Sequence, residues 1–288
     1  MLEFGRVLTA MVTPFDASGE IDFSLTEVLI EHLIANGTDT LVVAGTTGES
    51  PTLSTDEKIK LFKFVVDKVN KRVPIIAGTG SNNTKASIEL TKKAEEIGVD
   101  GVMLVVPYYN KPNQQGIYEH FKAIAESTTL PVMLYNIPGR SVVNMAVETV
   151  VKLSHINNIF AVKEASGDLN AMTEILSNAK EGFVLYSGDD GITIPVLSIG
   201  GHGVVSVASH VIGNEMQTLV NLFLEGNNED AAKLHQKLLP IMKGLFIAPN
   251  PVPVKAALQS IGVNAGTVRL PLVPLDETQQ KFIENLLK

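Results

Sequence analysis

One lysine in this chain follows an unbroken apolar segment and could act as a nucleophile. Lys163 comes directly after residues 158–162, Asn-Ile-Phe-Ala-Val, which is typical of a strand that is covered on both faces. A lysine amine attacks a carbonyl carbon only when it is neutral, and its ordinary pKa is about 10.4. Burial of the amine lowers this pKa and produces the nucleophile. The alternative is a lysine that simply leaves the strand for solvent.

A Schiff-base reaction also needs groups that move protons. Tyr135 ends the apolar segment that precedes the segment of Lys163, so it could protonate a carbinolamine and an aldehyde oxygen. Thr46 and Tyr109 end two earlier segments and could connect Tyr135 to water through a chain of hydroxyl groups. For Tyr108 and Tyr109, aromatic packing or an oligomer contact is an equally good interpretation.

The strands and helices that position these residues are predicted from the sequence, in which short apolar segments alternate with amphipathic segments. The apolar segments predict eight strands, and segments of this kind are typical of a parallel sheet that is covered on both faces. We expect a (β/α)8 TIM barrel rather than a doubly wound open sheet, because the units return regularly along the chain. The strands are expected at residues 6–12, 40–44, 74–77, 101–106, 131–136, 159–163, 183–187 and 203–207, with helices at 24–35, 55–70, 84–97 and 116–127.

Active sites of such barrels lie where the strands end. The expected strand ends carry hydroxyls, phenols, one lysine and, shortly after Tyr135, Arg140. The strand pattern stops after Asn214, and helices are expected at residues 215–224, 229–246 and 253–261. We therefore predict a catalytic barrel at residues 1–213 and a C-terminal helical extension at residues 214–288 that packs on it.

Composition and motifs narrow the classes of function. The chain has 288 residues, a net charge of -8, no cysteine and no run of basic residues, so neither nucleic-acid binding nor a thiolate site is expected. We expect a cytoplasmic protein, because no secretory signal or segment of about 20 apolar residues occurs. No cofactor or metal is expected, since the glycine-rich segments lack the dinucleotide and P-loop spacings and the six histidines show no paired ligand spacing. Asp189-Asp190 is interpreted as a helix N-cap rather than a metal site.

Several motifs together resemble the dihydrodipicolinate synthase family, and the resemblance extends from about Gly5 to the last helix. They are Gly45-Thr46-Thr47-Gly48-Glu49, Pro107-Tyr108-Tyr109, Tyr135-Asn136-Ile137-Pro138-Gly139-Arg140, Lys163-Glu164-Ala165-Ser166-Gly167-Asp168, Gly188-Asp189-Asp190, Gly200-Gly201-His202-Gly203 and Asn250-Pro251-Val252-Pro253-Val254-Lys255.

The resemblance implies a barrel with a C-terminal helical extension that condenses pyruvate with L-aspartate 4-semialdehyde, a step toward diaminopimelate and lysine. It implies a homotetramer arranged as a dimer of dimers. For catalysis, the resemblance implies that Lys163 forms the Schiff base and that Tyr135 transfers protons. Thr46, and Tyr109 from a neighbouring subunit, would complete the proton relay. For substrate binding, it implies that Thr47, Gly188 and the backbone near Val205 hold pyruvate and that Arg140 binds the semialdehyde carboxylate.

Three other interpretations are weighed against this one. N-acetylneuraminate lyase and keto-deoxy sugar acid aldolases share the barrel, the lysine and the tyrosine, but Arg140 suits a short substrate with a carboxylate. A catalytically dead barrel that serves as a binding module is disfavoured, because all the required residues are present.

The resemblance also bears on feedback inhibition by lysine. In lysine-inhibited relatives, a glutamate that pairs with the effector amine stands at the position of Ala86, and enterobacterial-type members carry a histidine at the position of Lys58. Ser50, Asn82 and Tyr108 suit the effector pocket, whereas Thr55 departs from its pattern as Lys58 and Ala86 do. We therefore predict weak or absent inhibition.

Overall fold

The computed structural model describes residues 3–288, and its strands form a closed parallel barrel in the order β1-β2-β3-β4-β5-β6-β7-β8. A closed barrel excludes the open doubly wound sheet and confirms the predicted fold class. Every strand is almost completely buried, as the apolar segments indicate. The strands are β1 (Val7–Ala10), β2 (Thr40–Val43), β3 (Ile75–Gly78), β4 (Gly101–Val105), β5 (Val132–Asn136), β6 (Ile159–Glu164), β7 (Val184–Ser187) and β8 (Gly203–Ser206).

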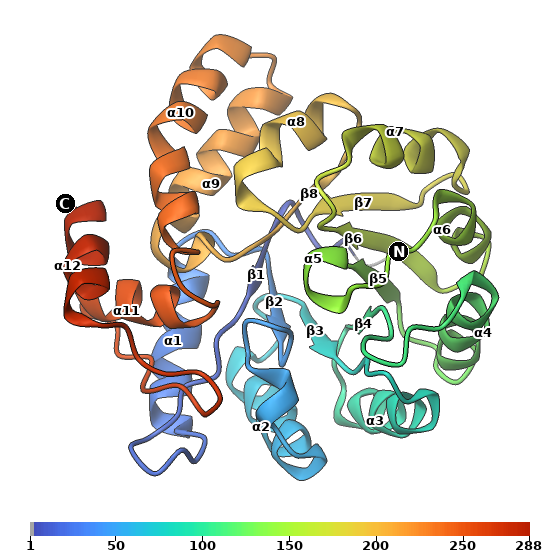
Figure 1. The fold of residues 1–288 in the computed structure, drawn as a ribbon, viewed down its shortest axis with the longest axis horizontal. Helices are drawn as coiled ribbons and strands as arrows, with labels where there is room; N and C mark the ends of the chain where they lie inside the picture. Colours follow the sequence, from blue (N-terminus) through green and yellow to red (C-terminus); the bar gives the residue numbers. More distant parts are fainter. Residues whose placement is uncertain (1–2) are drawn as a thin grey trace. The chain divides into compact units, whose positions relative to one another are not determined.

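The chain consists of two compact units, and the first contains Pro74–Val205 with Glu3. Helices follow its strands, and α3, α4, α6 and α7 pack against one another in sequence order (Figure 1). Its helices are α3 (Thr84–Ile97), α4 (Gln114–Ala125), α5 (Pro138–Ser141), α6 (Val147–Ser154), α7 (Leu169–Asn178), the 3-10 helix η2 (Asp190–Ile192) and α8 (Thr193–Ser198).

The second unit contains Phe4–Val73 and Ser206–Lys288. In it α9 packs against α10, and α11 packs against α12 (Figure 1). Its helices are α1 (Phe23–Ala35), η1 (Ser50–Thr52), α2 (Thr55–Val69), α9 (Ser209–Leu224), α10 (Asn228–Gly244), α11 (Val252–Ser260) and α12 (Glu277–Leu286).

Local capping explains where several helices begin. Ser54 and Glu57 form a capping box at the start of α2, and the Asn83 side chain caps α3, so both helices start where the sequence predicts. Helix α4 starts at Gln114, earlier than the predicted residue 116, because the side chain of Asn113 accepts a hydrogen bond from the Gly116 N–H.

Helix α9 also begins earlier than the sequence predicts, at Ser209 instead of residue 215, and Ile212 breaks its helical geometry with φ -132° and ψ 40°. The proposed division between residues 213 and 214 lies beside this break and stays a prediction. Within residues 3–288, no helix is both long and apolar enough to cross a membrane.

Candidate active site

Lys163 is the penultimate residue of β6, and only 5% of its surface is exposed. Burial lowers the pKa of its amine from 10.5 to about 8; the charge of Asp190 opposes this effect and the charge of Arg140 adds to it. Gly188, just beyond β7, leaves room for the lysine, because a Cβ there would lie 3.1 Å from Lys163 Cε and 2.7 Å from the Ala165 Cβ. The solvent-exposed alternative for Lys163 is therefore wrong.

Tyr135 faces Lys163 from the neighbouring strand. The two residues are register partners of β5 and β6, so their side chains point to the same face of the sheet. The Nζ of Lys163 lies 4.3 Å from the centroid of the Tyr135 ring, and Tyr135 is 3% exposed. A buried amine with a lowered pKa can attack a carbonyl carbon, and the neighbouring phenol can donate protons to the reacting groups and accept protons from them.

Arg140 lies in α5, directly after β5, and its side chain is exposed. The turn that carries it is fixed by the Ser141 hydroxyl, which donates to the carbonyl of Ile137 or that of Val143, each 2.8 Å away. Val142 ends the turn with φ 59°, a left-handed conformation that is rare for a β-branched residue. The positive charge of the Arg140 guanidinium lowers the pKa of Lys163, and the side chain is exposed to solvent.

Tyr109 does not join the pair of Lys163 and Tyr135 within this chain, since 90% of its surface is exposed. Its φ is 71°, a left-handed conformation held by neighbouring hydrogen bonds. The carbonyl of Tyr108 accepts from Asn82 Nδ2 at 3.2 Å and from the Asn110 N–H at 2.9 Å, and Asn110 Nδ2 donates to the Asn82 carbonyl at 2.9 Å. The loop therefore presents the phenol outward.

Val205 lies in β8 and is buried, whereas Thr46 and Thr47 follow β2 and belong to the second unit. Thr47 is 3% exposed, and its hydroxyl oxygen accepts a hydrogen bond of 2.9 Å from Asn250 Nδ2. With that acceptor role filled, the Thr47 hydroxyl can donate its own proton to an anion. The Asn250 Oδ1 is buried and has no hydrogen-bond partner among residues 3–288.

A buried ion pair between Glu49 and Lys255 fixes the turn that carries these threonines. Each residue ends one of the quoted motifs, but the motifs do not show that the two side chains pair. Lys255 Nζ donates to Glu49 Oε1 at 2.8 Å and to the Thr13 carbonyl at 2.7 Å, and both side chains are almost completely buried. Glu49 has φ 54°, and its Oε2 accepts from the Arg269 N–H at 3.0 Å. Such a pair is costly to break, because the remaining charge stays buried.

Asp189 acts as a helix cap, as predicted: its side chain accepts from the Gly191 N–H at 2.8 Å at the start of η2. The buried His210 is satisfied locally, since Nε2 accepts from the Val12 N–H at 3.2 Å and Nδ1 bonds the Val207 carbonyl at 2.8 Å. Among residues 3–288, no group of three or more acidic or histidine side chains could hold a metal ion.

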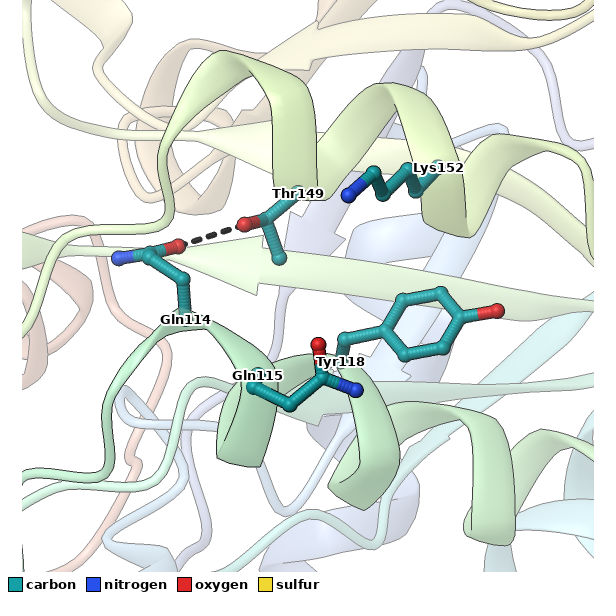
Figure 2. Close-up of a pocket in the computed structure, with 5 residues that line it drawn as sticks. All are labelled: Gln114, Gln115, Tyr118, Thr149 and Lys152. Carbon is teal, nitrogen blue, oxygen red and sulfur yellow. Dashed lines mark hydrogen bonds between the residues drawn. The ribbon is translucent and has the colours of Figure 1, made fainter.

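A groove of about 270 Å³ lies on the outer helices, and none of the predicted site residues lines it. Gln114, Gln115 and Tyr118 of α4 and Thr149 and Lys152 of α6 line it, as Figure 2 shows. The groove is therefore separate from the residues around Lys163.

Known proteins resemble this chain over its whole length. Residues 3–288 match the model of the dihydrodipicolinate synthetase family. The chain is 61% identical over 286 residues to the 4-hydroxy-tetrahydrodipicolinate synthase of Bacillus velezensis, with 99% of each protein covered.

Two crystal structures are similar at the level of the fold. A dihydrodipicolinate synthase from Bacillus anthracis superimposes with a TM-score of 0.98 and 59% identity, over 100% of this chain and 98% of the other. The enzyme from Cyanidioschyzon merolae with lysine bound gives a TM-score of 0.97 and 48% identity, over 99% of this chain and 97% of the other. The chain belongs to the dihydrodipicolinate synthetase family.

Proposed function

We propose that this protein condenses pyruvate with L-aspartate 4-semialdehyde to give 4-hydroxy-tetrahydrodipicolinate, in the pathway to diaminopimelate and lysine. The observation that carries the proposal is the buried Lys163, whose pKa falls to about 8 and whose amine lies against the Tyr135 ring. Both of these substrates are carboxylates with a reactive carbonyl group, which matches an amine nucleophile with a nearby guanidinium.

The reaction begins with the neutral Nζ of Lys163. It attacks the keto carbon of pyruvate, and the resulting carbinolamine loses water after its hydroxyl is protonated. The imine then loses a proton from the pyruvate methyl group to give an enamine. The enamine carbon attacks the semialdehyde aldehyde, whose oxygen takes up a proton. Attack of the substrate's own amine on the imine carbon closes the ring and releases Lys163.

Tyr135 is the proposed proton donor and acceptor in these steps, because it is the register partner of Lys163. Thr46 and Tyr109 would connect it to water. Thr47, Gly188 and the backbone near Val205 would hold the pyruvate carboxylate; the Asn250 bond to Thr47 supports this, since it leaves the Thr47 proton available. Arg140 would bind the semialdehyde carboxylate by charge-assisted hydrogen bonds.

We also propose a homotetramer arranged as a dimer of dimers, in which Tyr109 reaches the site of a neighbouring subunit. The exposure of 90% and the left-handed backbone of Tyr109 support this arrangement. The cytoplasm is the proposed compartment, because pyruvate and an amino-acid semialdehyde are metabolic intermediates.

The test is a coupled assay in which the purified protein receives pyruvate and L-aspartate 4-semialdehyde, together with the reductase that consumes the product. We expect turnover that depends on both substrates and is lost in Lys163→Ala. Cleavage of N-acetylneuraminate or of a keto-deoxy sugar acid, without turnover of the semialdehyde, would replace this proposal by one of the related aldolase activities.

A further inference from the structure

A second side-chain pair lies one residue beyond Tyr135 and Lys163. Asn136 and Glu164 are the next register partners of β5 and β6. Because successive side chains of a strand point to opposite faces, this pair lies on the other face from Tyr135 and Lys163. Both side chains are buried, with exposed fractions of 1% for Asn136 and 2% for Glu164.

Hydrogen bonds use both oxygens of Glu164 and both ends of the Asn136 amide. Asn136 Nδ2 donates to Glu164 Oε2 at 2.9 Å and to Asn144 Oδ1 at 2.7 Å, and Asn136 Oδ1 accepts from the Met145 N–H at 3.1 Å. Glu164 Oε1 accepts from the Ser166 N–H at 2.7 Å. Asn136 thereby joins the end of β5, the end of β6 and the segment that follows α5.

The segment after α5 is also fixed from its outer side. Gln114 Nε2 donates to the Asn144 carbonyl at 2.9 Å. The Oε1 of Gln114 accepts from the Ala146 N–H at 3.0 Å. It also accepts from the Thr149 hydroxyl at 2.7 Å, the bond that Figure 2 marks. A connected set of bonds therefore runs from the groove between α4 and α6 to the residue next to Lys163.

We propose that Asn136 and Glu164 are positioning residues that hold Tyr135 at the separation from Lys163 that proton transfer requires, a role that rests on the proposed function. The backbone register of β5 and β6 is irregular between Val132 and Met133, so the side-chain bridge at the opposite end of the two strands fixes the register where the chemistry occurs. A displacement of about 1 Å between reacting groups can cost roughly a hundredfold in rate.

These hydrogen bonds indicate a substitution that tests the bridge between Asn136 and Glu164. Two N–H donors face the two oxygens of Glu164, and Glu164→Gln leaves one acceptor and places an NH2 group against a donor. Combining Asn136→Asp with Glu164→Gln reverses the polarity: the new amide can donate to the new carboxylate and still accept from Ser166. The Asn144 amide, which accepts from Asn136 Nδ2 in the wild type, must turn over so that its NH2 group donates to the new carboxylate. The double variant therefore retains the bridge.

Asn158, at the amino end of β6, is a matched control. Its Nδ2 lies within hydrogen-bond distance of the carbonyls of Ala125, Thr128 and Leu130, so Asn158→Ala also removes side-chain bonds that hold this strand. It changes nothing at the end of β6 that carries Lys163.

The experiment measures the rate of imine formation at saturating pyruvate, by borohydride quenching and mass spectrometry of the Lys163 peptide, with the Tm of each variant. We expect Glu164→Gln to slow imine formation by about tenfold to a hundredfold. Asn158→Ala should lower the Tm to a similar extent and keep the wild-type rate. The double variant should return to within about threefold of wild type.

A rate for Glu164→Gln within about twofold of wild type overturns the inference. So does an equal slowing in Asn158→Ala at an equal loss of Tm. If Glu164→Gln does not fold, the double variant decides: a fast rate supports positioning, and a folded but slow protein overturns it. Absence of an imine in the wild-type protein would instead remove the proposed function itself.

Discussion

The Nζ of Lys163 lies 4.3 Å from the centroid of the Tyr135 ring, and the two residues are direct partners across β5 and β6. This relationship places a desolvated amine and a phenol on one face of two adjacent strands. Parallel strands in a closed barrel hold such a pair rigidly, since both backbones are hydrogen-bonded on each side. The pKa of the Lys163 amine, the effect of neighbouring charges on that pKa and the rate of its reaction with pyruvate can each be measured.

The rate of imine formation should depend on the charge of Lys163. With a pKa of about 8, the rate should rise about tenfold per pH unit below pH 8 and level off above it, because only the neutral amine attacks. Asp190→Asn removes a charge that raises the Lys163 pKa, so the midpoint should move to lower pH. Arg140→Ala removes a charge that lowers it, so the midpoint should move to higher pH.

Single-turnover trapping with pyruvate between about pH 6 and 10 provides the measurement. A wild-type rate that is still rising about tenfold per unit up to pH 10, as expected for an amine with the ordinary pKa of 10.5, would contradict the assigned desolvation. Shifts of the same sign in the two variants would contradict the assigned electrostatics.

Arg140→Ala should reduce use of the semialdehyde far more than it reduces imine formation, because pyruvate is expected to bind elsewhere. Loss of one charge-assisted partner costs roughly 2–5 kcal/mol, which is at least about thirtyfold in kcat/KM for the semialdehyde. Arg140→Lys is the matched variant: it keeps the charge but not the bidentate geometry, so it should recover only part of the activity. Unchanged semialdehyde kinetics in Arg140→Ala would show that the role is wrong.

Tyr109→Phe and Lys163→Ala subunits should complement each other. If Tyr109 serves a neighbouring site, each mixed dimer contains one complete site, and random pairing of equal amounts restores about a quarter of wild-type activity. Each variant alone should be nearly inactive, and native mass spectrometry should establish that mixed oligomers have formed. Verified mixed oligomers without activity would assign Tyr109 to its own subunit or to no role.

Lysine should inhibit the enzyme weakly or not at all. Ala86 is exposed on α3 and offers no carboxylate to the amine of the effector, and a buried ammonium without its partner costs about 3 kcal/mol or more. Lys58 is half-buried, and burial lowers its pKa; when it is protonated it would repel a cationic effector.

Lysine titration of the coupled assay measures this property. We expect no half-inhibition below about 1 mM, which corresponds to about 4 kcal/mol of binding. Ala86→Glu should raise the sensitivity and the isosteric Ala86→Gln should not. Half-inhibition of the wild type at lower lysine concentrations would show that these positions are misinterpreted.

The sequence predicts the parts of the fold that local patterns encode. Apolar segments define the strands, and the residue type at the end of each strand identifies Lys163 and Tyr135 as neighbours. These inferences succeed because a parallel barrel converts sequence order into spatial order. The paired strands β5 and β6 follow this rule directly.

Hydrogen bonds and ion pairs between residues that are far apart in the sequence cannot be predicted from a local sequence pattern. Glu49 and Lys255 are 206 positions apart, Thr47 and Asn250 are 203 apart, and Asn136 and Glu164 are 28 apart. The burial of Glu49, Lys255 and Asn250 depends on contacts with distant parts of the chain, so it has no local signature of the kind that the apolar segment provides for Lys163. The exposure of Tyr109 in the single chain is compatible with the oligomer contact that the sequence predicts.

Covalent trapping tests most directly whether Lys163 forms a Schiff base with pyruvate. The protein is incubated with pyruvate, reduced with borohydride and digested for mass spectrometry, with Lys163→Ala and a sample without pyruvate as controls. We predict one reduced pyruvate adduct per chain, on Lys163, and none in either control. An adduct on any other lysine, or an unmodified chain that still turns over both substrates, would contradict this assignment.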